Sequence, residues 1–241
     1  MPKNKIEVLS VIGNSKKDSK IIWKQIKYFI KHHVEKPIFE IILRTGKSIK
    51  VTGDHSLFKR IITNKYIGNY RSSPIEKMAP CKASELTKVD SVWCVDDYGF
   101  DAPSYPIDDD QLILIGLWLA DGCYDHTHGI HISTGNAQDI LSFLMKIGKK
   151  FKFNLTVRKN GDTTLNSRSF MRTFKEEFKL EGYSHTKKIP PWCFLLSNRQ
   201  IKLLLKGYFS GDGSADNSSI SCSSVSHELI SGLKELLNRL G

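Results

Sequence analysis

Two stretches decide the fold of this chain: residues 112–122, LILIGLWLADG, and residues 201–213, IKLLLKGYFSGDG. Each is an apolar run of about ten residues that follows a helix-capping pattern, Asp108 with Gln111 and Ser197 with Gln200. Each ends in Asp-Gly, and the two aspartates, Asp121 and Asp212, lie 91 residues apart. The spacing predicts two related helices that end on a carboxylate.

The residues after each stretch also correspond. Strands are expected at 129–134 and 220–224, and helices follow through 139–142 and 228–231. The first copy continues with strands near 151–158 and 163–166 and with a helix that carries Phe170, Phe174 and Phe178. We therefore predict an internal duplication of roughly 90 residues, of which the second copy stops early.

Small residues mark one face of each predicted helix. Gly116 and Gly207 stand five residues before the aspartates, and Ala120 and Gly211 stand directly before them. Such residues let two helices approach more closely than the usual 8–10 Å, which would bring both carboxylates together. Adjacent carboxylates repel each other unless a cation lies between them, and hard oxygen ligands favour magnesium. The alternative is that Asp-Gly only ends a helix, with glycine as its left-handed cap.

The charge distribution favours a nucleic-acid partner. The chain carries a net charge of +11, and residues 1–60 hold 14 Lys and Arg against five Asp and Glu. Residues 136–210 hold 15 basic and five acidic residues, whereas residues 108–135 hold five aspartates and no Lys or Arg. Carboxylates between basic blocks suit a metal-dependent enzyme that acts on a phosphate backbone, although lysines solvated on helix faces would give the same totals.

Together the two motifs resemble the LAGLIDADG, or dodecapeptide, motifs of homing endonucleases, and Lys188-Ile189-Pro190 is similar to the Lys-Ile-Pro block of that family. The resemblance covers residues 106–241 and implies αββαββα repeats that form a saddle over double-stranded DNA. The first repeat would be 106–196, the incomplete second 197–241, and a complete pair would be a monomeric pseudo-dimer. It implies a Mg²⁺ site and assigns these residues: catalytic Asp121, Asp212 and Lys188; metal-binding Asp121, Asp212, Gly122 and Gly213.

The N-terminal region resembles an intein splicing domain. Residues 36–58 are similar to the block that carries Thr-x-x-His, here Thr52 and His55, and residues 82–92 to a later strand of that domain. A histidine at the end of a hairpin can donate a proton to a peptide nitrogen and activate that bond. No opening nucleophile or closing His-Asn is present, so we expect an internal fragment that does not splice. Trp23, Tyr28 and Phe29 are expected in its β-core.

The sequence thus predicts an α+β chain: an all-β Hint-like splicing region over residues 1–105, followed by the duplicated endonuclease domain. The predicted function is magnesium-dependent, site-specific double-strand cleavage of DNA, with host exteins as covalent partners. Two alternatives stay open: a free-standing intron-type endonuclease or maturase, and an inactive nucleic-acid-binding relic. The longest apolar run is nine residues, and five widely spaced cysteines argue against a disulfide framework, so we expect an intracellular protein.

Overall fold

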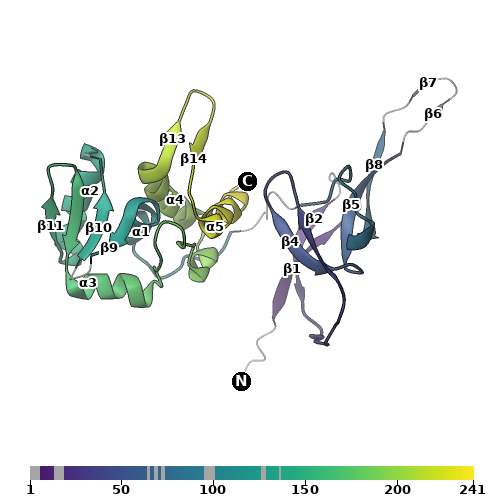
Figure 1. Ribbon diagram of the computed structural model, residues 1–241, viewed down its shortest axis with the longest axis horizontal. Helices are drawn as coiled ribbons and strands as arrows, with labels where there is room; N and C mark the ends of the chain where they lie inside the picture. The colour runs from purple at the N-terminus through teal and green to yellow at the C-terminus, as the bar shows by residue number, and fades with distance from the viewer. Residues whose placement is uncertain are drawn as a thin grey trace. The chain divides into compact units, whose positions relative to one another are not determined.

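The computed structural model describes residues 6–13, 19–63, 66–67, 70–71, 74–94, 101–125, 129–135 and 137–241. The chain divides into two compact units, Met1–Gly99 and Phe100–Gly241, both labelled in Figure 1 by their elements. The sequence places the corresponding boundary after residue 105. No helix of the described residues has the length and apolar character that crossing a bilayer requires.

The described part of the first unit consists of strands, turns and one 3-10 turn. The strands pair antiparallel as β1 with β2, β3 with β4, β5 with β8 and β6 with β7. Their bounds are β1 Glu7–Ile12, β2 Lys20–Gln25, β3 Ile38–Ile42, β4 Ser48–Thr52, β5 Ser56–Thr63, β6 Tyr66–Ile67, β7 Tyr70–Arg71 and β8 Ile75–Lys82, with the 3-10 turn at Ala83–Glu85. A hairpin joins β3 to β4 around Gly46, and this glycine has a φ of +80° that suits the tight turn.

This unit buries few apolar side chains. Among its described residues only Val51, Cys81 and Ala83 are buried and apolar. The three aromatic residues expected in a β-core are exposed instead, Trp23 at 50%, Tyr28 at 73% and Phe29 at 75%, so that prediction is wrong. The described strands pair only two by two, and a two-stranded ribbon has too little surface to cover large side chains.

The second unit holds the α-helices of the described chain and its largest sheet. Its elements are α1 Asp109–Asp121, β9 Gly122–Tyr124, β10 Gly129–Ser133, α2 Gln138–Phe151, β11 Asn154–Val157, β12 Asp162–Asn166, α3 Arg168–Arg172, a π-turn Thr173–Glu177, a 3-10 helix Pro191–Leu195, α4 Asn198–Asp212, β13 Gly213–Ala215, β14 Ile220–Cys222 and α5 His227–Asn238. A four-stranded antiparallel sheet has the order β11-β12-β10-β9, and β13 pairs with β14.

Two boundaries differ from the sequence expectation. The helix α2 continues through Phe151, so β11 begins only at Asn154. The helix expected to carry Phe170, Phe174 and Phe178 is short and passes into a π-turn. These three rings contact one another in order along the chain, Phe170 and Phe174 tilted and Phe174 and Phe178 edge to face, with centroids 4.9 and 5.6 Å apart. The ring contacts persist although the wider turn changes the helical register.

The centre of the second unit is the crossing of α1 and α4. Both helices bury large apolar side chains, and Trp118 and Tyr208 are fully buried. A Cβ atom placed on Gly116 would lie 2.6 Å from the Tyr208 nitrogen and 2.9 Å from the Gly207 Cα. The two backbones are therefore in direct contact, as the small residues predict.

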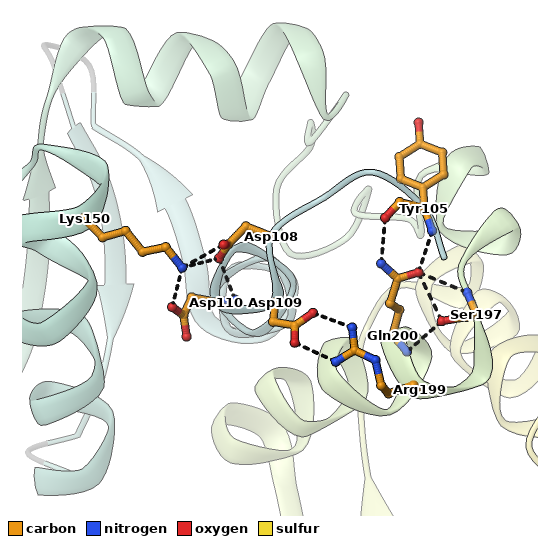
Figure 2. Close-up of polar contacts among 8 residues, drawn as sticks. All are labelled: Tyr105, Asp108, Asp109, Asp110, Lys150, Ser197, Arg199 and Gln200. Carbon is orange, nitrogen blue, oxygen red and sulfur yellow. Dashed lines mark hydrogen bonds and ion pairs between the residues drawn. The ribbon is translucent and has the colours of Figure 1, made fainter. Parts of the chain in front are cut away.

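Polar side chains hold the start of α1 to the start of α4 and to the last turn of α2, as Figure 2 shows. Both terminal nitrogens of Arg199 donate to the Asp109 carboxylate, at 2.6 and 2.9 Å. The Lys150 ammonium donates to Asp108 and Asp110, at 2.8 Å in each case. A paired guanidinium and carboxylate in this forked geometry fix orientation as well as distance.

The segment that enters α1 is held to α4 as well. The Gln200 side chain accepts from the Tyr105 backbone nitrogen and donates to the Tyr105 carbonyl, both at 2.8 Å. Gln200 also completes the predicted capping box with Ser197, and Asp108 caps α1 by accepting from the Asp110 nitrogen. The helix starts are thus fixed locally, and the crossing determines where their C-terminal ends lie.

The substitution Gly116→Ala tests the close crossing, because the crossing decides whether the unfolding free energy rises or falls. Helix propensity alone would make the substitution stabilising by about 1 kcal/mol. The close backbone contact predicts the opposite, a loss of about 2 kcal/mol from overpacking. Urea unfolding followed by helical circular dichroism measures the difference, with the exposed Lys202→Ala on α4 as the control that should change little. A more stable Gly116→Ala protein would contradict the close crossing.

Candidate functional site

The two predicted carboxylates lie at the C-terminal ends of the crossing helices. Asp121 is the last residue of α1, and Asp212 is the last residue of α4. A Cβ atom on Gly211 would lie 2.7 Å from the Ala120 Cβ and 3.0 Å from the Asp121 Oδ2. The residue before Asp212 is therefore packed against the end of α1, and the structure brings both ends together.

The glycines that follow these aspartates are not left-handed helix caps. Gly122 has φ −90° and Gly213 has φ −84°, both in the extended region. A Cβ on Gly122 would lie 2.5 Å from the Trp118 Cα, and one on Gly213 would lie 2.9 Å from the Phe209 Cα. Each glycine caps its helix through its backbone nitrogen and lets the chain turn straight from the helix into a strand.

The electrostatics of the two carboxylates reflect burial and proximity. Burial raises the pKa of Asp121, and the charge of Asp212 raises it further, whereas Lys187 lowers it. Burial likewise raises the pKa of Asp212, and the positive charge of Lys187 opposes part of that rise. A site that holds two such groups favours an additional positive charge.

Lys187 supplies one positive charge to this site. Its side chain is 4% exposed, and its ammonium donates to the Trp118 and Ala120 carbonyls at 2.9 and 3.0 Å. Burial lowers the pKa of this ammonium to about 8, against the opposing effect of Asp121 and Asp212. The Ser226 hydroxyl, which caps α5, donates to the Lys187 carbonyl at 2.6 Å. Lys187 thus connects the start of α5 to the end of α1.

Lys188, the lysine singled out from the sequence, lies in different surroundings. It is exposed and lines an open cleft of about 490 Å³ with Phe194, Glu228 and Glu235. The charges that shift the pKa of Asp121 come from Asp212 and Lys187. Sequence reasoning missed Lys187 because the motif offers two consecutive lysines, and only the tertiary packing decides which one turns inward.

The residues at the helix ends fit a divalent metal ion in part. Asp121 and Asp212 offer hard carboxylate oxygens, and Gly122 and Gly213, which the resemblance assigns to the same site, follow them directly. Among the described residues no group of three or more His, Cys, Asp or Glu side chains gathers to hold a metal. Two protein carboxylates suit Mg²⁺, which keeps several waters and commonly takes its remaining oxygens from a phosphate substrate.

One face of the four-stranded sheet is polar. Ile130 and Ile132 of β10 are buried, and the residue between them, His131, therefore belongs to the opposite face. His131 pairs with Cys123 on β9 and with Thr164 on β12. The same face continues through Thr156, Asn154 and Asn166, and the Asn166 amide donates to the Thr156 hydroxyl at 2.9 Å. Amide and hydroxyl groups on adjacent strands are suited to hydrogen bonding with base edges.

The splicing-block residues lie in one turn of the first unit. Thr52 ends β4, and the His55 backbone nitrogen donates to the Thr52 carbonyl at 3.0 Å. The 3-10 turn fixes this loop, since the Ser84 nitrogen donates to the Gly53 carbonyl at 2.9 Å. Beside them the Lys36 ammonium lies 2.6 Å from Asp54 and, as the largest influence, lowers the pKa of that carboxyl to about 2. The His55 side chain is exposed.

Comparison with known proteins agrees with this geometry. Residues 199–241 match the LAGLIDADG-like domain. This match covers α4, which ends at Asp212, and it runs through β13, β14 and α5. The second of the two aspartate-ending helices therefore lies in the segment that is similar to a LAGLIDADG-like domain.

Three curated relatives align with larger parts of the chain. A DNA polymerase of Thermococcus litoralis is 28% identical over 81% of this chain and 12% of its own length. The DNA-directed RNA polymerase subunit Rpo1C of Methanocaldococcus jannaschii is 28% identical over 92% of this chain and 29% of its own length. The iron-sulfur cluster assembly SufBD family protein ML0593 of Mycobacterium leprae is 27% identical over 53% of this chain and 15% of its own length. The chain spans less than a third of each relative.

Paired substitutions test which lysine belongs to the site. Lys187→Met removes the donor to two helix-end carbonyls and leaves the carboxylates without their cation, so we expect a loss of about 2 kcal/mol in unfolding free energy. Lys188→Met changes an exposed side chain and should stay within about 0.5 kcal/mol of the parent. Urea unfolding near neutral pH gives both values. Equal effects, or a larger loss for Lys188→Met, would contradict the placement of Lys187.

Proposed function

We propose that this chain is the endonuclease region of an intein, joined to part of its splicing domain, and that it cleaves duplex DNA at a specific site. The observation that carries the proposal is the meeting of Asp121 and Asp212 at the ends of two helices in backbone contact. The match of residues 199–241 to the LAGLIDADG-like domain supports the same conclusion.

The order of the elements supports a duplicated endonuclease architecture. A helix that ends in Asp-Gly, two short strands and a second helix occur first as α1, β9, β10 and α2, and again as α4, β13, β14 and α5. The first set continues into β11, β12 and α3. In this proposal residues 106–196 and 197–241 are two related repeats, which act together as a pseudo-dimer when the second is complete.

Asp121 and Asp212 hold a divalent ion, most simply Mg²⁺, in the proposed reaction. When bound, this ion activates water and stabilises the oxygen that leaves phosphorus. Asp121 and Asp212 would hold the ion through their carboxylate oxygens. Lys187 keeps a proton on an ammonium that balances part of their charge. This assignment moves the lysine role from Lys188 to Lys187, for the reasons of geometry given above.

The polar sheet face binds the DNA substrate in this proposal. An antiparallel sheet fits the major groove, where each base pair presents a distinct pattern of donors and acceptors. His131, Thr156 and Asn166 offer groups that read such patterns, and the excess of Lys and Arg attracts the backbone. The carboxylates then lie beside the phosphate to be cleaved.

The range of relatives favours an intein over a free-standing endonuclease. The matched segment occupies a small part of a DNA polymerase, an RNA polymerase subunit and an iron-sulfur cluster assembly protein, three proteins of unrelated activity. A segment inserted into different host proteins explains this distribution. Two of the matches also extend over most of the first unit, which an endonuclease alone would not need.

The first unit has a separate role in the proposal. Thr52 and His55 are placed in one turn that is fixed by backbone hydrogen bonds. His55 would donate a proton to a peptide nitrogen at the splice junction, and Thr52 would orient that peptide. The host exteins are the substrates of this step. The rival interpretation is a nucleic-acid-binding relic, which would keep the polar face without either reaction.

The endonuclease proposal predicts a selective loss of cleavage. Asp121→Asn and Asp212→Asn should each reduce Mg²⁺-dependent cleavage of a randomised plasmid library by about 100-fold or more, the scale of losing a preorganised electrostatic group. Duplex binding should survive, because Lys and Arg contacts supply most of the affinity. Asp139→Asn, an exposed aspartate at the start of α2, is the matched control and should cleave like the parent. Undiminished cleavage by either helix-end variant would contradict the site.

The intein proposal predicts the genomic surroundings of the coding sequence. Sequencing the flanking DNA should reveal one open reading frame whose upstream and downstream parts form the two halves of a single host protein. A self-contained gene with its own start and stop would contradict the intein and favour a free-standing endonuclease. This result is independent of cleavage activity.

A further inference from the structure

A basic cleft lies at the outer edge of the four-stranded sheet. It has a volume of about 870 Å³ and opens between the last turns of α2 and the start of β11. β11 is the edge strand, since it pairs only with β12. The residues used in the argument are Met145, Lys146, Lys149, Lys152, Phe153 and Asn154. No acidic residue lines the cleft.

Three lysines of this cleft keep their charges available. Lys146, Lys149 and Lys152 are exposed, and none has an ion pair within the described part of the chain. Their neighbour Lys150 behaves differently, because it is bonded to Asp108 and Asp110. Lys146 and Lys149 are three residues apart and so share one side of α2. The fold therefore pairs one lysine of the group, Lys150, with carboxylates, and it leaves the other three charges exposed to a partner.

The backbone at Lys152 is strained for a lysine. Its φ is +57° and its ψ +51°, a left-handed conformation that costs a non-glycine residue roughly 1–2 kcal/mol. Glycine or asparagine would adopt it more easily. The helix dipole favours cations within the last turn of α2, and this accounts for Lys149. It does not account for Lys146, because Lys146 lies more than one turn before the helix end. A bound anion accounts for all three positions.

Phe153 and Gly148 line the floor of the cleft. Phe153 is 5% exposed and packs beside Gly148, where a Cβ would lie 3.1 Å from the Phe153 carbonyl oxygen. Met145, by contrast, is 58% exposed. The cleft meets the sheet at Asn154, which lines the cleft and pairs with Asn166 on β12. A duplex that lies on the polar sheet face and extends past β11 reaches the three lysines.

We propose that Lys146, Lys149 and Lys152 bind phosphates of duplex DNA that flanks the segment contacted by the sheet face. This inference rests on the proposed function, since it extends the same DNA contact outward. The partner is a phosphate backbone because the three cations are spaced along a helix side and its end, a spacing that suits successive phosphates better than one small anion. The cleft adds affinity that does not depend on base sequence.

The salt dependence of binding tests the proposal. The cleft variant is Lys146→Gln, Lys149→Gln and Lys152→Asn, with asparagine chosen to tolerate the left-handed backbone. The matched control is Lys202→Gln, Lys206→Gln and Lys179→Asn, which removes three exposed charges, one of them also at a left-handed position with φ +54°. Circular dichroism confirms that both variants remain folded. Binding to a long duplex of mixed sequence is measured over a range of salt concentrations.

The cleft variant should show a plot of log binding constant against log salt that is less steep by about 3, because each phosphate contact contributes about 0.9. Its hydroxyl-radical footprint should shorten at the outer end, and the control should keep both the slope and the footprint. An unchanged slope in the cleft variant, or an equal change in the control, overturns the inference alone. Absence of salt-dependent duplex binding by the parent protein would overturn the proposed function, and this inference with it.

Discussion

The backbone contact between Gly116 and Gly207 is the constraint on which the second unit depends. A side chain at either position would meet main-chain atoms of the facing helix, so the helices approach this closely only with glycine there. The crossing has little freedom, because Arg199, Lys150 and Gln200 already fix the helix starts. Two carboxylates from distant parts of the chain consequently meet at the other end. The stability of the unit and the chemistry proposed for it thus arise from the same contact.

The C-terminal ends of α1 and α4 bring together charged groups, each of which would be costly to remove from water without the others. Half-buried Asp121 and Asp212 have raised pKa values, and the buried Lys187 ammonium has a lowered one. Lys187 offsets part of the cost by donating to helix-end carbonyls, where the helix dipole favours a cation. One ammonium between two carboxylates leaves room for further positive charge. This charge balance is consistent with the dication and the phosphate of the proposed function.

Much of this arrangement could be predicted from the sequence because its signals are local or repeated. Ser197 and Gln200 form the expected capping box, and the glycine spacing indicated the close crossing. Other features depend on packing that no short pattern contains. Lys187 and Lys188 are adjacent and chemically identical, and only the position of α5 turns Lys187 inward. Trp23, Tyr28 and Phe29 have the composition of core residues, yet the described strands of the first unit form separate ribbons that leave them exposed.

The central claim is that Asp121 and Asp212 hold one divalent ion between them. Paramagnetic broadening of the backbone amide signals by Mn²⁺, with Mg²⁺ as the diamagnetic control, tests it directly without a DNA target. We expect substoichiometric Mn²⁺ to broaden the Gly122 and Gly213 signals together, and we expect Asp121→Asn to remove the effect at both glycines. Broadening at only one helix end, or at both ends in the Asp121→Asn protein, would contradict a shared site.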